Sequence, residues 1–179
     1  MNLGAMVDLG VEGEYLEGEL QKLDLHGYHL KIYKAARKGI TGTKVDVLLD
    51  DRHHGHHSHH HDHRNLSDIR RIIEESALND RVKSWSMEIF MKVAEAEAKV
   101  HGKGINEVHF HEVGAVDSIV DIVGAAICRD VLVVDTILCS PIEVGSGFVN
   151  CAHGRLPVPA PATAEILKNV PIRSDGAPC

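Results

Sequence analysis

The sequence predicts an α/β or α+β protein with a mixed sheet and flanking helices. Stretches in which apolar residues recur every three or four positions alternate with stretches of period two. Clusters of glycine and proline separate these stretches, as expected between helices and strands. With 179 residues, of which 44% are hydrophobic and 25% charged, the chain is long enough to bury a core. We therefore expect a single domain over residues 1–179.

The first fifty residues predict two short helices followed by a hairpin. Apolar residues share one face in each helical stretch, and Gly10 and Gly13 indicate the turn between them. Residues 28–49 alternate with a period of two around Gly39 and Gly42. This pattern is typical of a hairpin, or of a pair of strands with a bulge.

Two further helices are predicted after a polar interruption. Asn65 or Ser67 can cap a helix that runs to about Ser76. A longer helix is expected over residues 80–101, ended by glycines. Its predicted apolar stripe consists of Val82, Trp85, Ile89, Val93 and Ala96.

The last third again mixes the two periodicities. The predicted elements are a strand over 107–111, an apolar helix over 112–132, a strand and glycine turn over 136–147, an extended stretch over 148–159, and a helix over 160–170 opened by Pro159 and Pro161.

Charge and cysteine usage narrow the class of protein. The net charge is −7 with histidines neutral, which argues against a nucleic-acid partner because phosphate binding needs clustered Lys and Arg. Four cysteines form no CxxC pair, and no apolar run reaches membrane-spanning length. We therefore expect no membrane partner and a cytoplasmic protein with reduced thiols. Cys128 and Cys139 lie in apolar stretches, which favours buried thiols.

Residues 51–64 contain the most conspicuous feature, a histidine tract. It has no apolar period, so it predicts a flexible, disordered histidine-rich loop. A purification tag or a plain low-complexity loop are the alternatives, but imidazole is the commonest protein ligand for nickel, zinc and copper. The predicted metal ligands are His53, His54, His56, His57, His59, His60, His61 and His63.

The densest set of candidate catalytic residues follows fifty positions later. On a strand, His109 and His111 would share one face, with Glu112 directly after them. On the next helix, Asp117 and Asp121 are four residues apart and so share a face. Imidazoles and carboxylates placed in this way can bind a metal or transfer a proton. The alternative is a helix start whose acids face solvent beside half-buried histidines.

A second set lies in the glycine-rich turn. Gly145, Ser146 and Gly147 would let the backbone approach a phosphate or a flat ligand, although a tight turn is the alternative. Cys151 and His153, two residues apart, are a further pair that could bind a soft metal, or attack a carbonyl if the thiol is activated. We treat the three turn residues and His153 as candidate cofactor-binding residues.

Longer motifs resemble the LarC family of nickel insertion proteins. These are VHFHEVGAVDSIVDIVGAA, SPIEVGSGFVNCAHGRLPVPAPATAEIL, KGITGTKVDV and AEAEAKVHG, in the family's order and with the histidine tract after the hairpin. The resemblance implies insertion of Ni²⁺ into a pyridinium bisthiocarboxylate mononucleotide, with one carbon–nickel and two sulfur–nickel bonds. It also implies use of CTP with Mn²⁺ or Mg²⁺, bound by a C-terminal domain.

The chain departs from the family pattern at both ends. The family motif FSGISGDM would finish where this sequence starts, and the segment ELTTPTGAA and the C-terminal domain would follow its end. We expect the C-terminal domain to act in cis or in trans. A missing first strand would leave a sheet edge or centre unfilled, so a homo-oligomer through that edge is a hypothesis.

Two hypotheses from different classes remain. In the first, the chain is part of a nickel-inserting cyclometallase, a CTP-dependent lyase. In the second, it is a non-catalytic module that stores or delivers nickel.

Overall fold

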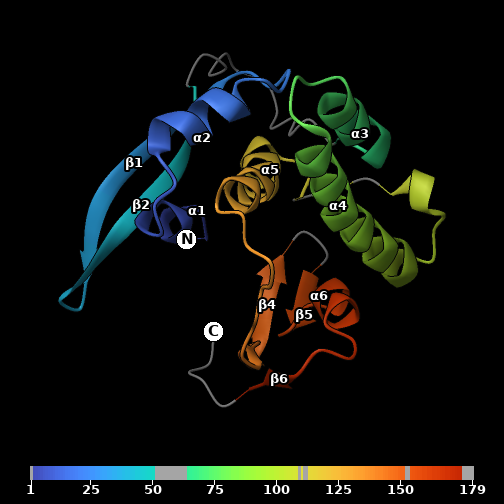
Figure 1. Cartoon of the computed structure of the whole chain (residues 1–179). Coiled ribbons are helices and arrows are strands. Elements are labelled where there is room, and N and C mark those ends of the chain that lie inside the picture. Colours follow the sequence, from blue (N-terminus) through green and yellow to red (C-terminus); the bar gives the residue numbers. More distant parts are fainter. Residues whose placement is uncertain (1, 51–63, 109, 111–112, 152–153, 175–179) are drawn as a thin grey trace. The chain divides into compact units, whose positions relative to one another are not determined.

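A computed structural model describes residues 2–50, 64–108, 110, 113–151 and 154–174. The chain divides into two compact units, Met1–Phe90 with His109–Val134, and Met91–Val108 with Asp135–Cys179. Both contain helices and strands, which confirms the predicted mixed α/β class (Figure 1). The histidine tract lies outside the described residues, and the single-domain expectation stays a prediction.

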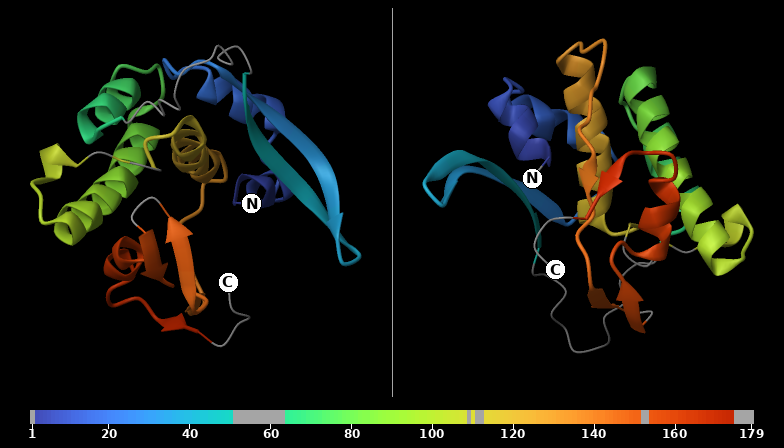
Figure 2. Two further views of the ribbon diagram at one scale, coloured as in Figure 1. Left: turned by 180° about the vertical axis from the view of Figure 1, so that it is seen from behind. Right: turned by 90° about the horizontal axis from the view of Figure 1, so that it is seen from below.

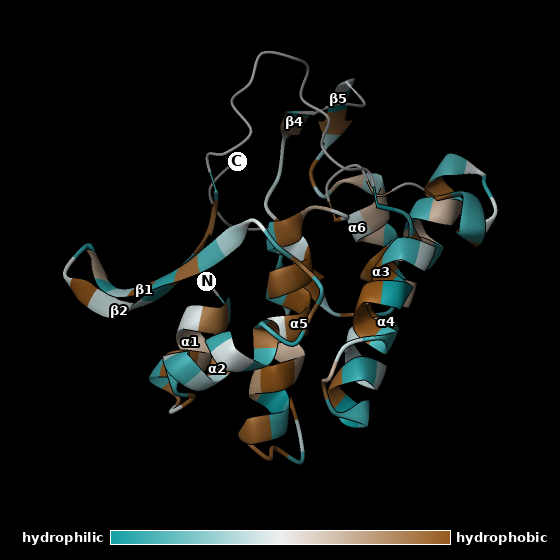
Figure 3. Cartoon of the chain, turned by 90° about the horizontal axis from the view of Figure 1, so that it is seen from above, coloured by the Kyte–Doolittle hydropathy of each residue, from teal (hydrophilic) through white to brown (hydrophobic). Residues whose placement is uncertain are grey.

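The first unit is built around helix α5, Val116–Val131, whose hydrophobic residues recur along most of its length (Figure 3). Helices α1, Asn2–Asp8, and α2, Gly13–Leu20, both pack against it. The turn between them passes through Gly10 with φ 113°, a left-handed conformation that favours glycine. The predicted pair of short helices is therefore confirmed. Fully buried side chains of this core include Leu3, Leu16, Leu20, Ile119, Val120, Val123 and Ile127.

The predicted hairpin is confirmed as β1, Tyr28–Arg37, paired antiparallel with β2, Ile40–Leu49. Its two strands form one long ribbon in both views of Figure 2. Lys38 and Gly39 form the two-residue turn with φ of 50° and 82°, the positive values of the turn that matches strand twist. Period two along both strands thus builds a regular ladder with no bulge in its register.

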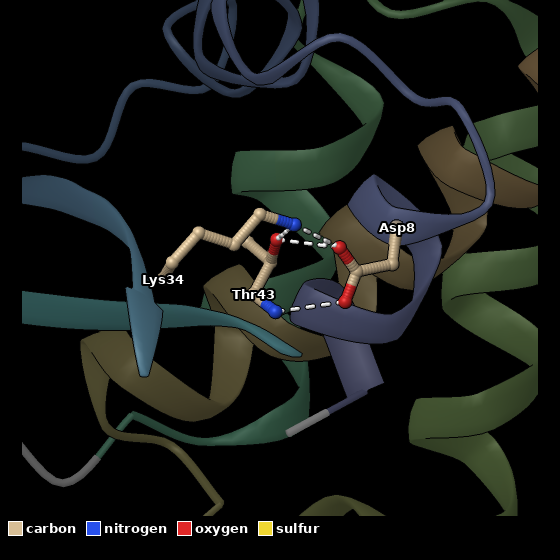
Figure 4. A network of polar contacts seen from close by, with 3 residues as sticks. All are labelled: Asp8, Lys34 and Thr43. Atoms are coloured by element: carbon tan, nitrogen blue, oxygen red, sulfur yellow. Dashed lines mark hydrogen bonds and ion pairs between the residues drawn. The ribbon is translucent and has the colours of Figure 1, made fainter. Parts of the chain in front are cut away.

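A polar cluster fastens the hairpin to α1 (Figure 4). The Asp8 carboxylate, in the last turn of α1, accepts hydrogen bonds from Lys34 Nζ at 2.5 Å, Thr43 N at 2.7 Å and Thr43 Oγ1 at 2.6 Å. These donors, the Lys34 ammonium first, hold the pKa of the Asp8 carboxyl well below its usual range. The cluster sets the position of α1 on one face of the hairpin.

Asn65, rather than Ser67, caps helix α3, Leu66–Glu74. The Asn65 side chain accepts a hydrogen bond from the Asp68 amide, and the Asp68 carboxylate accepts one from the Asn65 amide, each at 3.0 Å. This reciprocal pair is a capping box. The Ser67 hydroxyl only donates to the Asn65 side chain.

The long helix is confirmed as α4, Asp80–His101, but its buried stripe matches the prediction only at Val82 and Ala96. Ile89 is 40% exposed, whereas the neighbouring Phe90 is fully buried. The buried row instead steps by four residues through Val82, Ser86, Phe90, Ala94 and Ala98. Ser86 can join this row because its hydroxyl donates to the Val82 carbonyl at 2.7 Å.

The predicted strand over 107–111 is wrong where the structure describes it. Glu107 ends a short 3-10 helix, Ile105–Glu107, and neither Val108 nor Phe110 belongs to a strand. The Phe110 amide donates to the Arg64 carbonyl at 3.4 Å, while its ring lies buried 6.4 Å from that of Phe90. Burial of this ring, rather than strand pairing, decides the local conformation.

In the second unit the strands are short. β3, Ile142–Glu143, pairs in parallel with β6, Ile172–Arg173, and β4, Phe148–Cys151, pairs antiparallel with β5, Gly154–Pro157. Helix α6, Pro161–Ile166, begins at a proline as predicted. Within the described part of the chain, the strands thus form three two-stranded sheets, counting the hairpin.

Two remaining expectations concern thiols and membranes. Cys128 is buried as predicted, and burial raises the pKa of its thiol to about 11. The same expectation is wrong for Cys139, which is exposed because its extended stretch has no covering layer. None of the helices in the described ranges has the length and apolarity needed to cross a bilayer.

Candidate functional site

Helix α5 places the two predicted carboxylates on its solvent-facing side. Asp117 lies in the first turn and Asp121 one turn later, and both side chains are exposed. The Asp117 carboxylate accepts a hydrogen bond from the Ser118 amide at 2.8 Å. The buried face of the same helix anchors it in the core, so the acids are held on a rigid element.

The two carboxyl groups are close enough to influence each other. Partial burial raises the pKa of the Asp121 carboxyl, and the nearby charge of Asp117 raises it further. A carboxylate with a raised pKa is a stronger proton acceptor than an ordinary one. The pair therefore offers two carboxylates on the same face, of which Asp121 holds its proton more readily than an ordinary aspartate.

A junction around Arg64 holds the chain that leads into α5. Its Nη1 donates to the Gly114 carbonyl at 3.1 Å, and its own carbonyl accepts from the Phe110 amide. Gly114 is buried, and a Cβ there would lie 2.9 Å from the Arg64 carbonyl oxygen and 3.1 Å from that of Phe110. Only glycine fits this approach without a shift of the backbone.

This junction joins two motifs that are far apart in the sequence. Arg64 directly follows His63, the last histidine of the tract, and it contacts the segment that precedes Asp117. At the other end of the tract, the Asp50 amide donates to the Gly27 carbonyl at 2.9 Å. Both flanks of the tract are thus fixed within the first unit, one of them beside the candidate site.

Most of the predicted ligands lie outside the described residues. This applies to His109, His111, Glu112, His153 and all eight histidines of the tract. Across the ranges that the structure does describe, no group of three or more His, Cys, Asp or Glu side chains converges on a point. The assignment of these residues as metal ligands or catalysts therefore stays a prediction.

The glycine-rich turn is held by its own neighbours. The Gly145 amide donates to Glu143 Oε1 at 3.1 Å, its carbonyl accepts from Ser174 Oγ at 2.6 Å, and the Gly147 carbonyl accepts from the Val158 amide at 3.0 Å. Both glycines have positive φ, 69° and 98°, which supports the tight-turn alternative. An anion that approached the Gly145 amide would have to displace the Glu143 carboxylate.

Sequence reasoning missed Arg64 and a small cavity. The cavity, of about 110 Å³, lies between α2 and β1 and is lined by Glu17, Leu20, Gln21, Tyr28, His29 and Leu30. It is smaller than the roughly 300 Å³ at which small-molecule sites begin, so it does not hold a mononucleotide. The one sequence signal for Arg64 is its position, as a basic residue directly after the histidine tract.

Comparison with known proteins identifies the family. A family model described as "Nickel insertion protein" matches residues 1–178. The chain therefore belongs to this family, and the resemblance found from the motifs is confirmed.

Named relatives make the comparison more specific. The chain is 60% identical over 177 residues to the pyridinium-3,5-bisthiocarboxylic acid mononucleotide nickel insertion protein of Clostridium kluyveri. The aligned region covers 96% of this chain and 44% of that protein. It is 58% identical over 200 residues to the protein of the same name from Clostridium acetobutylicum, with 97% of this chain and 48% of that protein covered. The relative from Akkermansia muciniphila is 55% identical, with 94% and 42% covered. The chain thus spans less than half the length of these relatives. No solved structure matches it.

Proposed function

We propose that this chain captures Ni²⁺ and presents it for insertion into a pyridinium-3,5-bisthiocarboxylic acid mononucleotide, forming the nickel-pincer nucleotide. The names of the relatives support the metal and the substrate. The observation that carries the proposal is the Arg64 junction, because the residue that follows the histidine tract contacts the segment leading to Asp117 and Asp121. Metal gathered by the tract would reach that segment without leaving the protein.

The proposed chemistry needs ligands that bind Ni²⁺ reversibly and a group that accepts a proton. Neutral imidazoles, such as those of the tract, are borderline ligands that bind Ni²⁺ reversibly. As nickel bonds to the two sulfurs and to C4 of the ring, the C4–H bond breaks and its proton must be accepted. We assign the acceptor to Glu112 or His111, with Asp117 and Asp121 binding the precursor or the metal in transit.

Further parts of the activity belong to the same proposal. We expect a CTP-dependent cyclometallase, a lyase, in which CTP is held with Mn²⁺ or Mg²⁺ by the C-terminal domain acting in cis or in trans. Binding of the precursor by Gly145, Ser146, Gly147 and His153, and a cytoplasmic location, are also proposals.

A second function, nickel storage or delivery without catalysis, is favoured by the tract itself. Replacing all eight histidines of residues 53–63 with serine, at unchanged length, separates the two. Both functions predict loss of most nickel binding by the chain, measured by equilibrium dialysis, whereas His26→Ser, at an exposed histidine outside the tract, should change it little. Under insertion, the full-length variant should still form the cofactor when nickel is in excess. If excess nickel fails to restore it, delivery is the better description.

The role of the acids has its own test. In the full-length protein, Asp117→Asn together with Asp121→Asn should abolish nickel incorporation into the precursor while leaving nickel binding by the tract intact. Glu14→Gln, at an exposed acid on α2, is the matched control and should behave as wild type. Normal incorporation in the double variant would remove these residues from the site.

A further inference from the structure

The stretch from Asp135 to Ser174 has secondary structure but no core. Among its described residues, which exclude 152–153 and the side chain of Cys151, Gly145 is the only buried one. The first unit, by contrast, buries a continuous set of aliphatic side chains around α5. Because burial of apolar surface is what offsets the entropy lost on folding, this stretch lacks its main source of stability.

The apolar side chains that a core would use are present on the surface. Leu138 is 89% exposed, Ile137 66%, Phe148 58% and Ile172 50%. They lie on the extended stretch before β3, on β4 and on β6. Large apolar side chains that are exposed on several elements of one stretch are the ones that a covering layer would bury.

Residues 135–141 have the properties of an unpaired strand. They run directly into β3, belong to no strand or helix, and make no backbone hydrogen bond with any part of the chain that the structure describes. Ile137 and Leu138 are consecutive, so they point to opposite faces of such a strand. The segment thus offers one large apolar side chain to each face, which a strand covered on both faces of a sheet can bury.

The strand pairing within residues 135–174 is too short to be stable by itself. β3 and β6 share two residue pairs, and β4 and β5 share four. Two-stranded sheets of this size are at best marginally stable in water. Further strands and a covering apolar face are therefore needed.

We propose that residues 135–174 complete their sheet with a β-strand and an apolar face supplied by the polypeptide that the longer nickel insertion proteins carry outside the span matched here. More than half of each named relative lies outside that span, which is ample length for a strand and a covering layer. The added strand pairs with residues 135–141, and its own apolar side chains cover Ile137 and Leu138. The interaction is β-strand addition, in which main-chain hydrogen bonds supply affinity and side chains supply specificity.

Hydrogen exchange compares the chain alone with the full-length Clostridium kluyveri relative. We expect the amides of residues 136–140 to exchange nearly as fast in the isolated chain as in an unfolded one, while α5 stays protected. The matching amides of the full-length relative should exchange on the order of 100-fold more slowly. Equal protection of α5 and residues 136–140 in the isolated monomer would overturn the proposal, as would fast exchange in the relative. Protection that rises with concentration, together with a dimer mass by light scattering, would overturn it in favour of a second copy.

A variant pair tests the contact directly. The chain is co-produced with the part of the Clostridium kluyveri protein outside the matched span, and co-purification is measured. Leu138→Asp should reduce recovery of the complex at least tenfold. Leu9→Asp, at a leucine that is 70% exposed in the first unit, is the matched control and should not. Equal recovery with both variants would refute the assignment of Leu138 to the interface.

Discussion

Gly114→Ala tests whether the Arg64 junction holds the candidate site in place. The new Cβ would lie 2.9 Å from the Arg64 carbonyl oxygen, 3.1 Å from that of Phe110 and 3.2 Å from the Phe110 Cβ. The first two are backbone atoms that cannot rotate away, so the junction must open by a few tenths of an ångström. Overpacking of this kind costs about 1–3 kcal/mol, and loss of the Arg64–Gly114 hydrogen bond adds about 1.5 kcal/mol.

Urea unfolding followed by tryptophan fluorescence measures this cost. Trp85 is the only tryptophan of the chain, and it lies in the first unit with the Arg129 guanidinium 3.9 Å from its ring centroid. Gly18→Ala is the matched control, because a Cβ there meets nothing within 4 Å. In mid-helix this change should instead stabilise the protein by about 0.5–1 kcal/mol.

The same variant has a functional readout. In the full-length protein, Gly114→Ala should bind nickel through the tract as wild type does, yet incorporate it into the precursor more slowly. Gly18→Ala should incorporate it normally. A Gly114→Ala protein with wild-type stability, to within about 0.5 kcal/mol, and wild-type incorporation would refute the role given to the junction.

Three further predictions follow from single groups. Because folding lowers the pKa of Asp8, the stabilising effect of its carboxylate is complete above about pH 4 and is lost as the pH falls below that. In urea unfolding, Asp8→Asn should therefore destabilise the protein at pH 7 and progressively less toward pH 2. The control Asp24→Asn, at an exposed acid paired with a surface histidine, should change the stability little at either pH. In a variant without the other two cysteines, Cys139 should react with a thiol reagent at pH 8 on the order of 100-fold faster than Cys128, whose thiol is buried and has a raised pKa; equal rates would contradict the burial of Cys128. Nickel held by residues 53–63 should be released between about pH 7 and pH 5 as imidazoles protonate, and dialysis that finds binding unchanged at pH 5 would argue against histidine ligands.

The secondary structure was largely predictable because it depends on local patterns. The hairpin follows from period two with Lys38–Gly39 at the turn, and α3 begins where Asn65 can cap it. The errors arose where a tertiary contact overrode the pattern. The sequence around Phe110 alternates like that of a strand, but Val108 and Phe110 belong to none, and the Phe110 ring is buried beside that of Phe90.

The candidate site was predictable only in part. The spacing of Asp117 and Asp121 correctly placed both acids on one face of a helix. Their exposure, and the raised pKa of Asp121, depend on which face of α5 the core covers. The glycine-rich turn was found from its composition, but the Glu143 carboxylate on the Gly145 amide was not.

The sequence by itself determined the family and, apart from the strand expected over 107–111, most of the order of helices and strands, because these depend on residue type, motif and period. The tertiary structure alone decided that Arg64, which follows the histidine tract in the sequence, contacts the segment leading into α5. Arg64 and Gly114 are fifty positions apart, and only the tertiary fold brings the guanidinium before α3 to the carbonyl of the residue before α5. Contacts over such distances are selected by the burial of whole elements, which no local pattern encodes.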